Sequence, residues 1–300
     1  MKKIFVAMAA TALVLGGCTK GEDVNPSNNE MATVRFAAAG NTGIELMTRA
    51  GETQAYTGVI GINYDGAAWE VAPSTDVLAF TGNLSSTSNS LTVTGSAVTD
   101  GAVQIKSTGT NEAKFCSFGV AEGTVTINST TATLAANGNG SELTNDYIYA
   151  SAAQPVNGNA TVAFAYTHVM SKLRVEVYEK SYDNAKLNDG VTIDGFDGLG
   201  IVRNGKLNLL DGTITPDATV LPASIAINTE YFVLPQTAGT DKSFTVTYQG
   251  KEYTVALGNA GLTFAANKCR VIRLLVTGSG ITFTATLEDW TEENSDFNLQ

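Results

Sequence analysis

The chain has 300 residues, 43% of them hydrophobic, and 29 acidic residues outnumber 18 basic ones, which gives a formal net charge of −11 at pH 7. This length and apolar content allow one large domain or two ordinary domains with buried cores. The acidic balance, without any cluster of Lys or Arg in the sequence, argues against a surface for nucleic acid or anionic membranes.

The first 18 residues have the pattern of an export signal. Two lysines precede an apolar run from Ile4 to Leu15, which is too short for a permanent membrane span. The run ends in Leu-Gly-Gly-Cys, and this ending resembles the lipobox of bacterial lipoproteins, in which the cysteine (here Cys18) receives diacylglycerol. We expect a signal peptide at residues 1–17 and a lipidated Cys18. The alternative is ordinary secretion with Cys18 discarded.

Residues 18–32 predict a linker, because after the cysteine they are polar, unpatterned and contain proline. Beyond them, apolar residues recur with period two, which is the pattern of half-buried strands. The alternating sets are Val34 and Phe36; Val125 and Ile127; Leu173, Val175 and Val177; Phe244, Val246 and Tyr248; Tyr253, Val255 and Leu257; and Ile281, Phe283 and Ala285.

Turn residues agree with an antiparallel all-β fold. Asn204-Gly205 and Gln249-Gly250-Lys251 each separate two apolar runs, and both predict hairpins. The stretch from Gly82 to Asn111 is rich in Gly, Ser, Thr and Asn, so we expect long loops or weak edge strands there. The architecture expected from these features is an antiparallel β-sandwich.

The strand pattern breaks near residues 181–188, and this break predicts a domain boundary. The expected units are an N-terminal sandwich at residues 33–182 and a C-terminal sandwich at residues 183–300. An earlier break near Asn157 stays open.

Apart from Cys18 the chain has two cysteines, Cys116 and Cys269. They could form one disulfide or remain as two small buried thiols. Their surroundings lack CxxC spacing, and we expect no metal site. The acidic loop with Asp189 and Asp194 does not have the spacing of a defined calcium loop, which favours a solvated loop.

Catalytic motifs are not found. His168 is the only histidine, so any histidine-based catalysis must use it, and its place between two strand-like runs favours a structural role. Residues 200–206 have the spacing of a phosphate-binding loop, but Leu207 stands where Ser or Thr would hold magnesium. We therefore predict no catalytic residue and no cofactor.

Several short motifs follow one another in a recognisable order. They are the lipobox; TVRF followed by MTRAGE; DYIYAS; VAFAYTHVMSKLRVEVY; EYFVLPQTAG; and FAANKCRVIRLLVTGSGITFTATLEDWTEEN. This series resembles the fimbrillin family, the lipoprotein pilins of type V pili, over essentially the whole mature chain. One departure is Asn267-Lys268-Cys269, where relatives usually carry a Gly-Lys-Tyr-like turn.

The resemblance implies two transthyretin-like antiparallel β-sandwich domains and a defined route of assembly. In the family, an arginine-specific protease trims the lipidated precursor, the first strand leaves, and an extended segment of another subunit fills the groove as a donor strand. Arg49, followed by Ala50, matches the cleavage position. Arg35 is the rival, but it lies inside the expected first strand.

The C-terminal residues supply a candidate donor segment. Phe297 and Leu299 share one face of an extended chain, so they could enter a neighbour's groove. The alternative is a frayed acidic terminus.

The resemblance thus implies a non-enzymatic structural subunit of a cell-surface type V fimbria, anchored in the outer membrane by its lipid. The implied partners are other fimbrial subunits, an arginine-specific maturation protease and the outer membrane; a host or bacterial surface receptor stays open, as does a stalk or tip role. The alternative is a surface-anchored adhesin or glycan-binding module that does not polymerise. A hydrolase would need His168 in a cleft.

Overall fold

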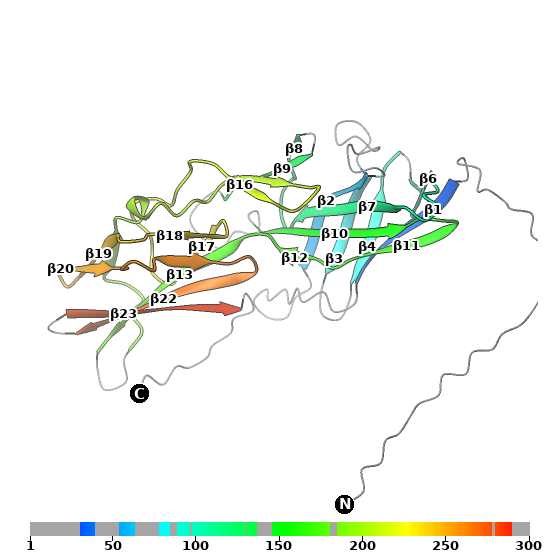
Figure 1. The fold of residues 1–300 in the computed structure, drawn as a ribbon. Coiled ribbons are helices and arrows are strands. Elements are labelled where there is room, and N and C mark those ends of the chain that lie inside the picture. Colours follow the sequence, from blue (N-terminus) through cyan, green and yellow to red (C-terminus); the bar gives the residue numbers. More distant parts are fainter. Residues whose placement is uncertain are drawn as a thin grey trace, which may run out of the picture.

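The computed structural model describes residues 31–39, 54–63, 78–84, 89–96, 98–128, 130–136, 146–180, 185–277 and 280–289. Within these ranges the regular secondary structure is β-strand, apart from a single 3₁₀ turn, η2 (Asp197–Leu199). Across this part of the chain no helix qualifies as a membrane span. The predicted all-β class is confirmed, and Figure 1 shows the strands gathered into two bodies that lie end to end.

The N-terminal body is a sandwich of two sheets. Sheet A has the strand order β11-β1-β6-β5, and sheet B has the order β12-β10-β7-β2-β3-β4. Their bounds are β1 (Met31–Ala38), β5 (Val98–Thr99), β6 (Ala102–Lys106) and β11 (Asn159–Phe164) in sheet A, and β2 (Gln54–Asn63), β3 (Leu78–Leu84), β4 (Ser90–Thr94), β7 (Glu112–Val120), β10 (Tyr147–Pro155) and β12 (Thr167–His168) in sheet B.

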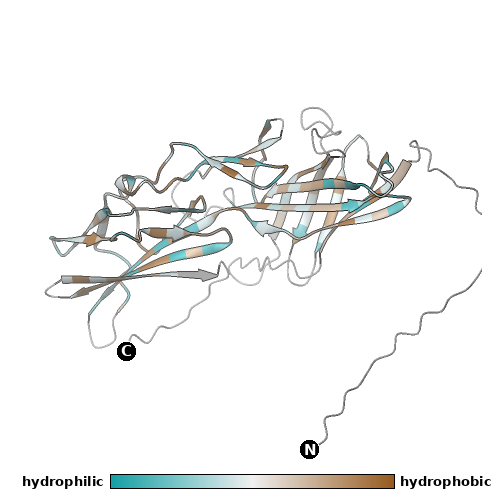
Figure 2. Cartoon of the chain, in the orientation of Figure 1, coloured by the Kyte–Doolittle hydropathy of each residue, from teal (hydrophilic) through white to brown (hydrophobic). Residues whose placement is uncertain are grey.

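The C-terminal body packs sheet D, with the order β17-β13-β22-β23, against two smaller sheets, β14-β19-β20 and β18-β21. The bounds are β13 (Ser171–Glu179), β14 (Val191–Asp194), β17 (Glu230–Val233), β18 (Gln236–Ala238), β19 (Ser243–Tyr248), β20 (Lys251–Ala256), β21 (Leu262–Phe264), β22 (Lys268–Thr277) and β23 (Gly280–Asp289). Figure 2 shows hydrophobic and hydrophilic residues alternating along the strands of both bodies, as expected when one face of a strand is buried.

A further four-stranded sheet, with the order β16-β15-β9-β8, joins the two bodies. Its strands are β8 (Ile127–Asn128) and β9 (Thr131–Leu134) from the first half of the chain, and β15 (Gly205–Asn208) and β16 (Ile214–Pro216) from the second. Strand β9 pairs with β15, so backbone hydrogen bonds cross between the two bodies. A buried apolar cluster lies under this bridging sheet and includes Phe118, Leu134, Tyr147, Leu207 and Phe232.

Each sandwich contains one parallel strand pair among its antiparallel pairs. Strand β1 runs parallel to β11 and antiparallel to β6. Strand β13 likewise runs parallel to β22 and antiparallel to β17. The first strand of each body therefore lies between a parallel and an antiparallel neighbour, a pairing that periodicity alone did not reveal.

The strand positions can be compared with the linker and the domain boundary that the sequence predicts. Strand β13 precedes the boundary expected at residues 182/183, yet it is an interior strand of sheet D. Strand β1 begins at Met31, inside the segment 18–32 expected as a linker. Of the stretch from Gly82 to Asn111, β4 and β5 are short edge strands as expected, whereas β6 lines the core with Val103 and Ile105.

The two predicted hairpins had different outcomes. The turn at Gln249-Gly250 is confirmed, because both residues have positive φ (51° and 73°) and β19 pairs directly with β20. The Asn204-Gly205 hairpin is wrong: β15 begins at Gly205 and turns back later, into β16. Gly205 serves close packing instead, since a Cβ there would lie 2.5 Å from the carbonyl oxygen of Thr215.

Candidate functional site

Strand β1 is an interior strand of the N-terminal sandwich, although it is the first element of the described chain. It pairs with β11 from Thr33 to Ala38 and with β6 from Met31 to Arg35. Sheet A therefore uses both edges of β1. We call the space that β1 occupies between β6 and β11 the β1 slot.

Alternate side chains of β1 point into the core. Ala32, Val34 and Phe36 are buried, and they are separated by the more accessible Thr33 and Arg35. The Phe36 ring stacks on Phe164 with centroids 5.8 Å apart. It also meets Phe115 edge to face at 6.0 Å, so one aromatic side chain of β1 contacts both sheets of the sandwich.

Contacts at the rim fix the register of β1. The Thr33 N–H donates to the Gly158 carbonyl (2.6 Å), and the Ala39 N–H donates to the Phe164 carbonyl (2.8 Å). On the solvent side the Arg35 guanidinium donates to the Asp100 carbonyl (2.8 Å). Met31, at the start of the strand, is 57% exposed.

The geometry of the β1 slot determines what it can do. If β1 were absent, β6 and β11 would each expose an unpaired row of N–H and C=O groups, and apolar pockets would open where three side chains now sit. An extended segment with apolar residues at alternate positions would satisfy both edges and fill those pockets. The slot is therefore suited to strand exchange.

A family model described as fimbrillin-like matches residues 109–290, which is more than half of the chain. The chain belongs to the fimbrillin-like family. This membership supports a role as a fimbrial subunit or in cell adhesion, and the matched residues include the motifs from DYIYAS to the ITFTATLEDW strand.

Two solved structures share the fold of this fimbrillin-like protein. One is described as a candidate cell adhesion protein from Bacteroides uniformis, with a TM-score of 0.58 and 17% identity over 87% of this chain and 98% of that chain. The other is a candidate cell adhesion protein from Bacteroides ovatus, with a TM-score of 0.55 and 16% identity over 88% of this chain and 98% of that chain. A comparison with curated proteins gave no match.

Of the residues that the sequence singled out for assembly, the structure places those in the first strand. Val34 and Phe36 lie in the β1 slot, as the alternation predicted. The remaining candidates lie outside the described residues; they are Cys18, Arg49, Ala50, Phe297 and Leu299.

The walls of the slot were not singled out from the sequence. The slot is lined by two strands that lie far apart in the sequence. They contribute Val103 and Ile105 of β6 and Val162 and Phe164 of β11. The alternation in Asn159–Phe164 is a signal for a strand, but it does not indicate which strand is its neighbour.

His168 lies in a buried polar cluster of this fimbrillin-like protein and not in a cleft. It is 1% exposed, and its Nδ1 lies 2.6 Å from Oδ1 of Asp146, whose Oδ2 accepts a hydrogen bond from Tyr56 (2.8 Å). Burial raises the pKa of Asp146, but the charge and hydrogen bond of His168 outweigh it and hold that pKa below 3.8. Burial and Asp146 together raise the pKa of Tyr56. A substrate could not reach this histidine.

Neither Cys116 nor Cys269 forms a disulfide, and both are buried. Burial raises the pKa of the Cys116 thiol to about 12, partly offset by a hydrogen bond from Gly61, so this thiol stays protonated and unreactive. In the part of the chain that the structure describes, no three Cys, His, Asp or Glu residues come together as metal ligands. Asp194 instead accepts a hydrogen bond from Ser224.

Proposed function

We propose that this protein is a structural subunit of a cell-surface type V fimbria, in a stalk or tip position, and that it assembles by proteolytic activation and donor-strand exchange. The observation that carries the proposal is the β1 slot. Strand β1 is held between β6 and β11 by backbone pairing and by three inward side chains, which is an arrangement that a strand from another subunit could reproduce.

Cleavage after Arg49 would make β1 a separate, non-covalently held strand. Arg49 lies between the end of β1 at Ala38 and the start of β2 at Gln54, so a cut there severs β1 from the rest of the sandwich. Arg35 is a poorer target, because its backbone is paired on both sides within sheet A.

In this proposal, the N-terminal part of the chain carries the lipid anchor and the C-terminal part carries the donor segment. Lipidation of Cys18 would anchor the precursor in the outer membrane until assembly. Phe297 and Leu299 would supply two apolar side chains of the donor segment, and burying each contributes about 1.5–3 kcal/mol. The partners are therefore other fimbrial subunits, the arginine-specific protease and the membrane.

Treatment of purified precursor with an arginine-specific protease tests this function. We expect one new N-terminus at Ala50 and ladders that survive SDS without heating. The Arg49→Ala variant is expected to stay uncut and monomeric, and Phe297→Asp combined with Leu299→Asp is expected to be cut but to stay monomeric.

Cleavage elsewhere, or normal assembly of the Arg49→Ala variant, would contradict the maturation step. Cleavage at Arg49 without any polymer would instead favour a surface-anchored adhesin or glycan-binding module that does not polymerise.

A further inference from the structure

The side chains that point inward from β1 differ in size in a definite order. Along the strand they are Ala32, Val34, Phe36 and Ala38, of which the first three are buried and the last is half-buried against the same core. Alternation alone does not require this order of small, branched, aromatic and small residues, because any apolar side chain satisfies a period of two. The neighbouring strands supply the reason for the order.

The small residues of β1 lie beside large residues of its neighbours. Ala32 is the partner of Ile105 on β6, and Ala38 is the partner of Phe164 on β11. Both partners are buried in the core of the N-terminal sandwich, where side chains interlock closely. A larger side chain at either position of β1 would therefore compete with its partner for the same space.

The aromatic residue of β1 lies where sheet A narrows. Strand β6 begins at Ala102, after the Asp100-Gly101 turn, and Ala102 is the partner of Arg35. Phe36, one residue farther along, is therefore paired with Val162 of β11 alone. With a paired strand on one side only, this position has room for a ring, which stacks on one aromatic side chain of β11 and meets another of β7 edge to face.

The branched residue of β1 has a partner on each side. Val34 lies between Val103 of β6 and Ala160 of β11, so its position has less room than that of Phe36. An aromatic ring at the first position would be overpacked, and a valine at the second would leave a void beside two rings. The slot therefore fits one order of side-chain sizes.

The same order gives the slot a direction. Strand β1 carries its branched residue first and its aromatic residue two positions later, and it runs parallel to β11. Another segment with this order fits when it runs the same way. A segment with the aromatic residue first would place both side chains correctly only by running antiparallel to β11.

The remaining contacts of β1 discriminate less between segments. Nδ2 of Asn89 donates to the Ala39 carbonyl (3.1 Å), a main-chain contact that any extended segment can make. On the outer face Gln104 donates to Oγ1 of Thr33 (2.7 Å), and Arg35 donates to a carbonyl of the β5–β6 turn. These two outer contacts are exposed, so each adds little. Selectivity therefore comes from the inward side chains.

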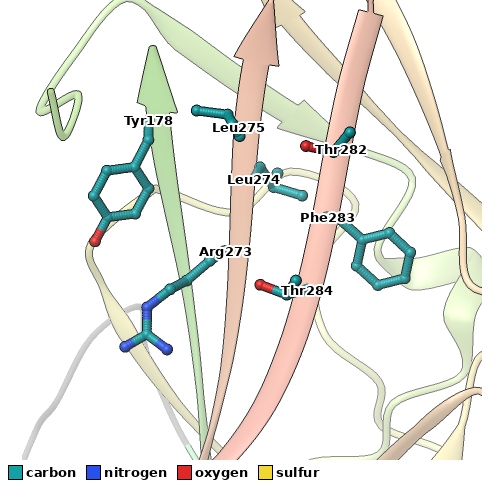
Figure 3. Close-up of a pocket in the computed structure, with 7 residues that line it drawn as sticks. All are labelled: Tyr178, Arg273, Leu274, Leu275, Thr282, Phe283 and Thr284. Atoms are coloured by element: carbon teal, nitrogen blue, oxygen red, sulfur yellow. The ribbon is translucent and has the colours of Figure 1, made fainter. Parts of the chain in front are cut away.

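An apolar hollow on sheet D shows why open strand edges matter for the slot. It has a volume of about 70 Å³ and is lined by Tyr178, Arg273, Leu274, Leu275, Thr282, Phe283 and Thr284. Figure 3 shows these residues on three adjacent strands, which are β13, β22 and β23. Because β22 pairs with both of the others along this stretch, an extended segment could not enter between them.

We propose that the β1 slot selects the segment that fills it by the order of side-chain sizes. Its ligand is an extended peptide with a small, a branched, an aromatic and a small residue at alternate positions, read from the N-terminus when the peptide runs parallel to β11. This inference rests on the proposed strand exchange and states the chemistry of the incoming segment.

An exchange of two residues in the uncleaved, full-length protein tests the order of sizes. We expect Val34→Phe combined with Phe36→Val to lower the Tm by about 6–10 °C, although composition and alternation are unchanged. The matched control combines Thr33→Arg with Arg35→Thr on the outer face, and its Tm is expected to stay within about 2 °C of the wild type. Equal Tm values for the two variants would overturn the proposal.

Peptide uptake by a protein with the wild-type slot tests selectivity even if the exchanged variant does not fold. A site for an unrelated sequence-specific protease, inserted after Gly43, allows β1 to be cut free without using Arg49. We expect the labelled peptide MATVRFAAA, which is residues 31–39, to enter the cut protein roughly tenfold more than MATFRVAAA, as measured by native mass spectrometry.

The outcomes separate selectivity from strand exchange itself. Equal uptake of both peptides would overturn selectivity and leave exchange standing. Uptake of neither peptide would overturn the proposal together with strand exchange. Neither measurement depends on cleavage at Arg49 or on polymer formation, so a failure of those steps does not alter what the two experiments decide.

Discussion

At the residue scale, the single histidine acts as a structural group. Tyr56 comes from β2, Asp146 precedes β10 and His168 lies in β12, so their contacts tie three strands of sheet B together. If one partner in a buried polar cluster is removed, the charge that remains lacks a partner and cannot be solvated. The folded protein then loses more stability than it would at an exposed site.

Replacing His168 with Ala is expected to lower the free energy of unfolding by about 3–5 kcal/mol, because Asp146 would lose its main charge partner in a buried site. Urea denaturation measures this loss. Asp189→Ala, at an exposed loop position, serves as the control and is expected to change stability by about 0.5 kcal/mol or less. A loss below about 1 kcal/mol in the His168 variant would argue against a stabilising cluster.

The pH dependence gives a second check on the same cluster. The pKa of Asp146 is lower in the folded protein than its ordinary value of 3.8, so the stabilisation is fully present above that value. It is lost as the pH falls through the lower, folded pKa. An Asp146→Asn variant lacks this dependence, so the stability gap between wild type and variant is expected to narrow below pH 3.8.

At the scale of the element, β1 combines tight packing with a separable position in the chain. Its inward residues are as buried as those of any core strand, yet β1 is the first described element of the chain. Once the chain is cut at Arg49 as proposed, β1 can leave without breaking the connectivity of the remaining fold, whereas β13, its counterpart in the second sandwich, stays linked on both sides. The proposed exchange therefore involves β1 of the first sandwich and not β13 of the second.

The Phe36→Ala variant is expected to lose about 3–5 kcal/mol of unfolding free energy, because the ring fills space between Phe115 and Phe164. Thermal or urea unfolding of the uncleaved protein measures the loss. Met31→Ala, in the same strand but largely exposed, is expected to remain within about 0.5 kcal/mol of the wild type. If the two variants were equally stable, β1 would not be packed as the structure shows.

The sequence predicted β1 as a strand with one buried face, but it did not predict which strands lie on either side of it. Alternation placed Val34 and Phe36 on one buried face, because a strand with one buried face has period two. The parallel neighbour β11 begins more than 100 residues later, and a local pattern carries no information on pairing partners. The Asn204-Gly205 prediction failed for a related reason: a glycine needed for close approach of β16 cannot be told from a turn glycine without that neighbour.

At the scale of the whole molecule, the bridging sheet makes the two sandwiches one structural unit. The Tyr149 hydroxyl donates to the Leu209 carbonyl (3.0 Å), and the Ala136 N–H donates to Oδ1 of Asn204 (2.8 Å). Strand β7 is buried on both faces, because Phe115 enters the N-terminal core while Phe118 enters the bridge cluster. A subunit built this way would transmit load along its length without relying on a flexible linker.

We expect the wild type to unfold in a single calorimetric transition, and the Leu207→Ala variant to separate it into two, since Leu207 packs in the bridge cluster. Both Leu207→Ala and the control Leu221→Ala, whose side chain lies in the C-terminal core, are expected to cost about 2–5 kcal/mol. Only the first is expected to uncouple the bodies. Two transitions in the wild type would show that the bridge does not couple them.

The sequence by itself determined the strand class, the buried face of the main strands and the Gln249-Gly250 hairpin, because these depend on residues close together in the chain. The order of motifs also indicated the family. Only the tertiary structure decided that β1 lies between β6 and β11, that β13 belongs to sheet D, and that β9 and β15 join the two bodies. Those pairings depend on contacts between distant residues, and many pairings are compatible with the same alternating pattern.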